Sequence, residues 1–359
     1  MLEAVNREQS DVLVSVETMK ALVYYGSRDI RIEHVEKPTP GPNEVLIRVT
    51  HAGISQTQVN EFVEGPFVIN TAPHPLTGKA VPLIPGHEFG GIIEEVGATA
   101  GKQLIGKQVA ALPRITCGEC RYCRSGKEHI CKKIAYIGLL GENGGFAQYA
   151  VVPKQNIVEV QDTAAMSFIE PILVGLHAGR VIQHLLPASK VLVMGAGGIG
   201  VCLAAVLRDY FRADVTLTDI LPNRLARIKK AGFNVLGKNQ LKREYDIVID
   251  CAGGDPISQR SAIFEAFDYI YNGGTVLNLG TYFHPLSFVP VTLTVPEMQL
   301  RTSFAYDSHD EELLNDALEA IKLDFSELID KIDFDKLIVE GYFRSEVDKD
   351  SFIRLVVQP

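Results

Sequence analysis

The chain has 359 residues, longer than one ordinary hydrophobic core, so two domains are expected. Its formal net charge of −9, without any long Lys/Arg run, excludes nucleic acid or an anionic membrane as the main partner and favours a small-molecule ligand. There is neither an uninterrupted apolar run of the roughly eighteen residues that a membrane span needs nor a basic and apolar leader at the N-terminus. We therefore expect a cytoplasmic protein with no membrane partner.

The first half of the chain has strand patterns. Residues 1–18 are polar and mixed, and we treat them as an N-terminal extension without an assigned function. Apolar or alternating runs separated by Gly and Pro then follow at residues 19–25, 29–35, 43–50 and 89–96. These runs predict a barrel-like, antiparallel domain.

From about Ile172 the pattern changes to alternating helices and strands. Strands are expected near residues 191, 215, 247 and 276, with helical segments such as 224–231 between them. This alternation is typical of a doubly wound parallel sheet, so the fold class is α/β. A helix at 311–321 and a closing strand at 352–357 should pack back on the first domain. The predicted domains are 19–174 with 309–359, which carries the catalytic groups, and 175–308, which binds a dinucleotide.

A glycine-rich turn lies at the centre of the second domain. The apolar run 191–194 breaks into glycines and resumes as a helix-like pattern, so it predicts a strand, a tight turn and a helix. The residues expected to contact a cofactor there are Gly195, Gly197, Gly198, Ile199 and Gly200. In a Gly-x-Gly-x-x-Gly turn the first glycine permits the turn, the second lets the backbone approach a pyrophosphate, and the third allows close helix packing. A βαβ turn without a ligand is the alternative.

The end of the next strand indicates which cofactor binds. It ends at Asp219, at the distance where a carboxylate accepts hydrogen bonds from a ribose diol. A carboxylate repels a 2′-phosphate and Ile220 is not basic, so we predict NAD rather than NADP. Arg224 is the one argument for NADP, because its side chain could reach toward a phosphate.

Four cysteines form the most specific motif. They are spaced Cys-x2-Cys-x2-Cys-x7-Cys at positions Cys117, Cys120, Cys123 and Cys131. Four thiolates close a tetrahedral shell around zinc and leave no open position, so the predicted site is structural. The alternative is four reduced, unliganded cysteines.

Taken with the glycine turn and the cysteine motif, the segment Gly86-His87-Glu88-Phe89-Gly90 makes the chain resemble the medium-chain, zinc-containing alcohol dehydrogenase family from residue 19 to 359. Three further segments resemble its 2,3-butanediol and sorbitol dehydrogenase branch: Gly65-Pro66-Phe67, residues 74–78 and Ile169-Glu170-Pro171. The resemblance implies a GroES-like catalytic domain, a Rossmann domain, a catalytic zinc between them, and hydride transfer between a secondary alcohol and a nicotinamide.

The metal ligands that the resemblance implies are only partly present. His87, Glu88 and Glu170 match the family, but Ser55 stands where a cysteine ligand is expected. A neutral serine hydroxyl binds zinc far more weakly than a thiolate. Two carboxylates could compensate, with water or Ser55 completing the shell, or the catalytic metal could be lost.

The implied proton relay is altered as well. Thr57 preserves the relay hydroxyl, whereas Gln58 replaces an acid and Asn60 replaces the histidine that often ends the relay. Asn60 cannot take up a proton at neutral pH, so the outward path must differ.

Three functions remain open at this stage. The first is a metal-dependent polyol, vicinal-diol or sugar dehydrogenase; the second is a metal-independent carbonyl reductase; the third is a dinucleotide-binding protein without turnover. The resemblance also suggests a homo-oligomer, a dimer or tetramer. The β-prone run 286–295 could pair across a dimer or form an internal strand.

Overall fold

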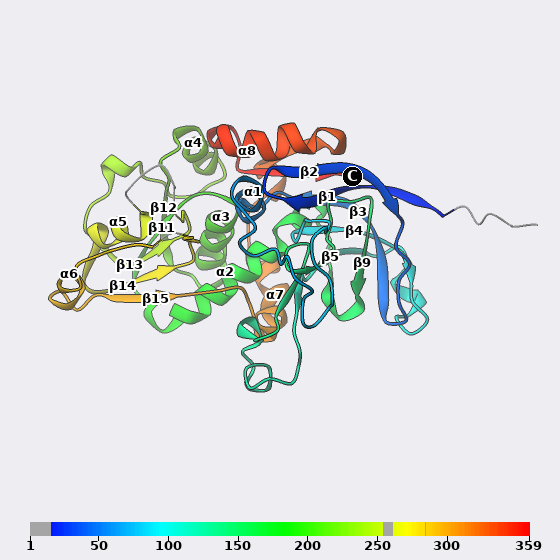
Figure 1. Ribbon diagram of the computed structural model, residues 1–359. Helices are drawn as coiled ribbons and strands as arrows, with labels where there is room; N and C mark the ends of the chain where they lie inside the picture. Colours follow the sequence, from blue (N-terminus) through cyan, green and yellow to red (C-terminus); the bar gives the residue numbers. More distant parts are fainter. Residues whose placement is uncertain (1–15, 254–260, 284) are drawn as a thin grey trace, which may run out of the picture.

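The computed structural model describes residues 16–253, 261–283 and 285–359. Two sheets lie toward opposite ends of the molecule, with the helices α2 (Ile169–Ile182) and α3 (Gly198–Ala205) between them (Figure 1). The predicted α/β class with one β-rich domain is confirmed. The residue ranges assigned to the two domains stay a prediction.

The first sheet is built from the β-rich half of the chain and from its C-terminal tail. It has seven strands in the order β10-β5-β4-β3-β17-β16, with β9 also paired to β3. The strands are β3 (Glu44–Gly53), β4 (Phe89–Val96), β5 (Gln108–Ala111), β9 (Tyr149–Pro153), β10 (Ile157–Glu159), β16 (Ile329–Asp333) and β17 (Arg354–Gln358). All pairs are antiparallel except β16 with β17. Because β17 pairs with β3, the closing strand packs on the first domain as predicted.

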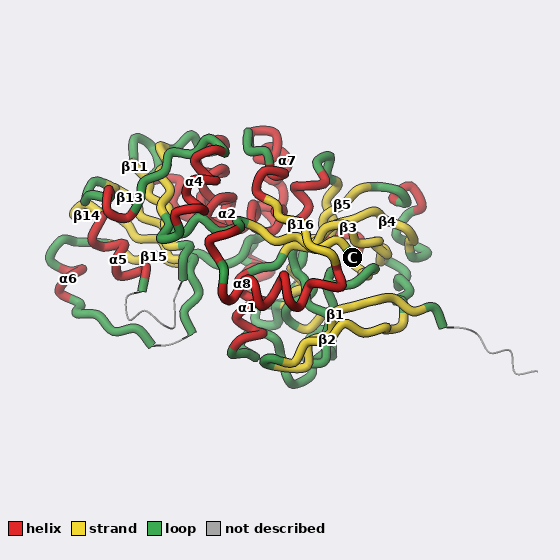
Figure 2. The backbone as a smooth tube through the Cα atoms, turned by 90° about the horizontal axis from the view of Figure 1, so that it is seen from above, coloured by secondary structure: helices red, strands yellow, loops and turns green. Residues whose placement is uncertain are grey.

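Smaller elements surround this sheet. A hairpin of β1 (Thr18–Gly26) and β2 (Asp29–Glu36) lies to one side of β3, β4 and β5 (Figure 2). The cysteine-containing lobe follows β6 (Arg114–Ile115) and precedes β7 (Ala135–Ile137), which pairs with β8 (Gly141–Glu142). The short helices are α1 (Gln56–Val63) and α8 (Arg344–Val347).

The second sheet is fully parallel, with the strand order β12-β11-β13-β14-β15. Its strands are β11 (Lys190–Met194), β12 (Asp214–Thr218), β13 (Tyr245–Asp250), β14 (Ile270–Asn278) and β15 (Gln299–Thr302). Crossover helices include α3, α4 (Pro222–Lys230) and α5 (Ala262–Tyr269). Buried Val, Leu and Ile side chains run along its central strands, as expected when helices cover both faces.

Helix α2 forms the core between the sheets. With the flanking turns it makes a segment, Thr163–Leu185, that is long and apolar enough to cross a membrane, but 83% of its most apolar window is buried inside the protein. A Cβ on Gly175 would lie 3.0 Å from the Cα of Leu203 in α3, so the two helices touch backbone to backbone. Helix α7 (Ser308–Ala320) adds Leu314 and Ala317 to the same core. The segment Thr163–Leu185 is therefore a core helix of a folded domain.

The prediction of a strand at residues 286–295 is wrong. The structure has a helical turn there, α6 (Val291–Thr294), and the next strand is β15. Pro290 has φ −55° and its carbonyl accepts from the N–H groups of Leu293 and Thr294, so it starts a helical turn. The local proline geometry overrides the β-propensity of the valines.

Candidate active site

The glycine turn has the backbone that a dinucleotide requires. Gly195 follows β11 with φ +96°, a conformation that favours glycine. A Cβ on Gly200 would overlap the carbonyl oxygen of Gly195, so α3 starts directly against the strand. A Cβ on Gly197 would have only the Nη1 atom of Arg224 within 4 Å, at 3.8 Å, so this backbone is open to a ligand. Gly198 and Ile199 form the first turn of α3.

Asp219 is held beside this turn. Its Oδ2 atom accepts a hydrogen bond from the backbone N–H of Ala196 at 2.7 Å, and its Oδ1 atom accepts from Leu221 at 3.0 Å. Arg224 Nη1 lies 3.7 Å from Asp219 Oδ2, while its Nη2 donates to the carbonyl of Lys349 at 2.6 Å. The arginine is therefore already bound to the carboxylate and to the C-terminal segment.

Three of the proposed metal ligands come together. Ligand atoms of His87, Glu88 and Glu170 all lie within 4.8 Å of one another, and all three residues are buried. His87 and Glu88 follow Gly86, which has φ +104° and where a Cβ would lie only 2.7 Å from the backbone nitrogen of Phe146, so the position requires glycine. Glu170 comes from the first turn of α2. We call these three residues the His87 cluster.

Burial controls the protonation of the His87 cluster. Desolvation, aided by the nearby Arg354, lowers the pKa of His87 to about 3, so its imidazole is neutral at pH 7. Desolvation raises the pKa of Glu170 to about 7. The Nδ1 atom of His87 is buried and has no hydrogen-bond partner among the described residues. Such a donor set of one neutral imidazole and two carboxylates fits a divalent cation.

Arg354 is a site residue that the sequence analysis missed. It lies on β17, is only 4% exposed, and forms an ion pair with Glu88. Its Nη2 donates to the Ser167 carbonyl at 3.0 Å, and its Nη1 would lie 3.0 Å from a Cβ on Gly198. One guanidinium therefore spans from the His87 cluster to the glycine turn. An arginine inside an otherwise apolar terminal strand was the available signal.

Ser55 caps a helix in the structure. It is the N-cap of α1, and its Oγ accepts from the backbone N–H of Gln58 at 3.2 Å. The same hydroxyl and the Ser55 N–H both point to Gln58 Oε1, at 3.2 and 3.0 Å. Two of the three departures from the family pattern, Ser55 and Gln58, thus form one reciprocal capping box. Thr57 lies half-buried in the same first turn, and Asn60 Oδ1 accepts from Gln56 Nε2 at 2.9 Å.

The four cysteines of the lobe form a closed set. Neighbouring Sγ atoms are 3.5 to 3.9 Å apart, close to the spacing of about 3.8 Å that Zn–S bonds of about 2.3 Å give in a tetrahedron. Backbone N–H groups, chiefly those of Glu119 and Cys123 respectively, lower the pKa of Cys117 and Cys120. The residues fit a structural zinc, with Cys117, Cys120, Cys123 and Cys131 as its ligands.

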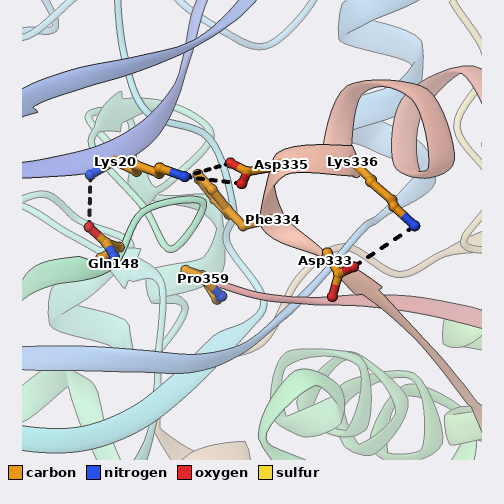
Figure 3. Close-up of a pocket in the computed structure, with 7 residues that line it drawn as sticks. All are labelled: Lys20, Gln148, Asp333, Phe334, Asp335, Lys336 and Pro359. Carbon is orange, nitrogen blue, oxygen red and sulfur yellow. Dashed lines mark hydrogen bonds and ion pairs between the residues drawn. The ribbon is translucent and has the colours of Figure 1, made fainter.

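A separate hollow lies on the outer face of the molecule. It has a volume of about 520 Å³ and is lined by β1, the segment after β16, and the C-terminal Pro359 (Figure 3). Lys20 pairs with Asp335 at 2.8 Å, and Lys336 lies 3.9 Å from Asp333. Because its charges are paired with one another, we assign it no ligand.

A dinucleotide-type turn joined by one arginine to a buried metal-type cluster defines a nicotinamide-dependent dehydrogenase. Comparison with known proteins supports this class. Residues 41–162 match the model of the alcohol dehydrogenase GroES-like domain. The chain is 32% identical over 278 residues to an L-threonine 3-dehydrogenase of Chelativorans sp. (strain BNC1), covering 73% of this chain and 76% of that protein.

Two butanediol dehydrogenases are similar over nearly the whole chain. The (R,R)-butanediol dehydrogenase of Neisseria gonorrhoeae (strain ATCC 700825 / FA 1090) is 28% identical over 355 residues, 95% of this chain and 99% of that protein. The crystal structure of 2R,3R-butanediol dehydrogenase from Bacillus subtilis superimposes with a TM-score of 0.81 at 24% identity, covering 95% and 99% of the two chains. The chain therefore belongs to the medium-chain, zinc-containing alcohol dehydrogenase family and is an oxidoreductase acting on CH–OH groups.

Proposed function

We propose that this chain is an NAD-dependent dehydrogenase that interconverts a vicinal diol or polyol and its ketone, with a divalent metal held by the His87 cluster. The observation that carries the proposal is the convergence of His87, Glu88 and Glu170 beside an arginine that reaches the glycine turn. The names of the butanediol dehydrogenases above support a substrate with two adjacent oxygens.

Each side chain of the site has its own role in the proposed reaction. When bound, the metal supplies Lewis acidity toward the substrate oxygen. The neutral His87 and the carboxylate of Glu170 provide the ligand lone pairs, and Arg354 holds Glu88 at the edge of the cluster. Thr57 Oγ1 passes the hydroxyl proton toward the cofactor ribose and solvent. Because Asn60 is bonded to Gln56 and cannot be protonated, the last step to solvent goes through water.

Gln58 supports a polar substrate. Its Oε1 is used by Ser55, but its Nε2 is buried and without a hydrogen-bond partner among the described residues. A buried amide donor that lacks a partner is costly unless a ligand satisfies it. We assign this donor to the second oxygen of the diol. A screen of vicinal diols, polyols and their mono-alcohol analogues for NADH formation tests this, and equal kcat/KM for diols and mono-alcohols would refute it.

We propose NAD as the cofactor, with Asp219 on the ribose diol. Both oxygens of Asp219 are fixed by backbone N–H groups, and Arg224 is bound to it rather than free for a phosphate. Turnover should be much faster with NAD than with NADP, and Asp219→Ser should narrow the difference. A wild-type preference for NADP would overturn the assignment.

The second candidate is a metal-independent carbonyl reductase. It is favoured by one observation: both hydrogen bonds of the Ser55 hydroxyl are made to Gln58, so it offers a weak fourth ligand at best. Metal counting on a sample that retains activity separates the candidates. Zinc bound outside the cysteine lobe and lost in His87→Gln supports the first, whereas undiminished turnover without that ion supports the second.

We further propose a cytoplasmic homo-oligomer. The reduced, zinc-binding state of four cysteines suits a reducing compartment. Around the edge strand β15, the side chains of Phe288, Val289, Val295 and Phe304 are each about half exposed or more. Such an apolar edge suits pairing with a second copy. Light scattering of wild type and Val295→Asp should give a multimer and a smaller species, respectively.

A further inference from the structure

A second group of metal-type side chains lies outside the active site. It joins three elements: His129 from the turn Glu128–Ile130 inside the cysteine lobe, His177 from α2, and Asp307, the N-cap of α7. Their ligand atoms lie within 4.8 Å of one another. We call these three residues the His129 cluster. We propose that the His129 cluster binds a divalent transition-metal ion of the zinc type, separate from the cysteine lobe and from the His87 cluster.

The spacing fits a shared ion better than direct hydrogen bonds. Asp307 Oδ2 is 3.8 Å from His129 Nδ1 and 3.7 Å from His177 Nδ1, too long for a hydrogen bond in either case. Ligands at about 2.0 to 2.1 Å from a tetrahedral zinc are about 3.3 Å apart. A contraction of about half an ångström would therefore bring Asp307 Oδ2 to the expected ligand–ligand spacing from each imidazole nitrogen.

Two of the three atoms that would bind the ion, on His129 and Asp307, are not hydrogen-bonded to described residues, whereas His177 Nδ1 is bonded to Asp310. Asp307 Oδ1 accepts from Arg180 and from two backbone N–H groups of α7, whereas its Oδ2 faces the two imidazoles. His129 Nδ1 is buried and has no hydrogen-bond partner among the described residues. A network built only for stability would pair this nitrogen. The unpaired nitrogen and the free carboxylate oxygen thus point to an absent shared partner.

The carboxylate of Asp310 lies next to the imidazole of His177. Asp310 Oδ2 lies 2.8 Å from His177 Nδ1 and also accepts from the Asp307 N–H at 2.8 Å. One nitrogen cannot both donate to a carboxylate and bind an ion, so an ion on His177 Nδ1 would replace this hydrogen bond and leave Asp310 as the fourth ligand.

The local charge also favours a cation. Asp307 and Asp310 are buried, and among the described residues the one guanidinium that contacts them is that of Arg180, at 2.8 and 2.6 Å. Glu128 adds a third carboxylate nearby, since it accepts from the hydroxyl of Ser308 at 3.0 Å. Three acids against one arginine leave a negative excess that a dication offsets. Arg114 does not change this balance, because it is paired with Glu311 at 2.6 Å.

An ion here would tie the cysteine lobe to the rest of the catalytic unit. His129 lies between Cys123 and Cys131, and His177 lies on the same helix as Glu170. Binding to the folded chain alone raises its stability by mass action. We therefore expect added zinc to raise the unfolding temperature even when the His87 cluster is disabled.

The test compares bound zinc in full-length variants. His129→Gln is the main variant, because its Nδ1 has no partner to lose, and the exposed His309→Gln is the matched control. After equilibration with zinc and gel filtration, His129→Gln should carry one zinc per chain fewer than wild type, and His309→Gln the same number as wild type. Equal zinc in wild type and His129→Gln would overturn the proposal.

A second measurement guards against misfolding and against the other sites. In a His87→Gln background whose cysteine lobe is first filled with zinc, added cobalt should still give a spectrum of nitrogen and oxygen ligation, without thiolate charge transfer. His129→Gln should abolish this spectrum while far-ultraviolet circular dichroism stays unchanged. Its persistence in His129→Gln would also refute the site. Because the readout is made with the His87 cluster disabled, failure of the proposed catalytic metal leaves this test intact.

Discussion

The cysteine lobe and the His87 cluster are two metal-type sites that differ in how far apart their residues lie in the sequence. All ligands of the lobe lie within residues 117–131, on a partly exposed loop, and their spacing in the sequence already predicts a closed shell. The His87 cluster is buried and draws on the segment just before β4, on α2 and, through Arg354, on β17. A local site is therefore visible in the sequence, whereas a site assembled from distant segments is visible only by resemblance and without its supporting residues.

The largest effect is expected in the lobe. Cys123→Ser should abolish the structural zinc, because zinc binding to such sites contributes on the order of 10 kcal/mol and the remaining thiolates cannot close the shell. Metal analysis and limited proteolysis between residues 117 and 131 measure the loss. Ser125→Ala, an exposed change in the same lobe, should leave both unchanged. Full zinc retention in Cys123→Ser would contradict the closed-shell interpretation.

The next largest effect is expected in the His87 cluster. His87→Gln should lower kcat/KM by about a thousandfold, roughly 4 kcal/mol, because we propose the neutral imidazole as a ligand of the catalytic metal. Steady-state kinetics with the best diol measures this. The exposed His34→Gln on β2 serves as the control. A fall of less than tenfold would favour the metal-independent candidate.

The buried carboxylate gives a pH-dependent effect of intermediate size. Burial raises the pKa of Glu170 from 4.5 to about 7, so the metal-free folded chain keeps a proton that the unfolded chain has lost. Stability therefore falls as the pH rises through this window. Relative to Glu170→Gln, metal-free wild type should lose on the order of 3 kcal/mol between pH 4.5 and 7, and nothing below pH 4.5. Urea unfolding across this range measures it, and parallel curves for the two proteins would contradict it.

The smallest effect concerns the capping box. Ser55→Cys and Ser55→Ala should each lower the free energy of unfolding by about 1 kcal/mol, because both lose the hydroxyl that caps α1. Only Ser55→Cys should hold the second metal more tightly against a chelator, because it restores a thiolate. Equal metal retention in the two variants would place residue 55 outside the coordination sphere.

Much of the fold followed from local patterns. The alternation of helices and strands after residue 172, the strand ends around Gly195 and Asp219, and the closing strand at residues 352–357 were predicted and are present. These features depend on hydrophobic period and on glycine conformation, which neighbouring residues decide. The run 286–295 failed, because Pro290 sets a helical turn that β-propensity does not reveal.

By itself, the sequence determined the cysteine spacing, the glycine turn and the types of side chain available for chemistry, because each depends on residues close together in the chain. Only the tertiary structure decided which groups meet. It paired Arg354 with Glu88 and brought His129 beside His177 and Asp307. Contacts between residues so far apart arise when the sheets and α2 pack together, and burial then sets their charge.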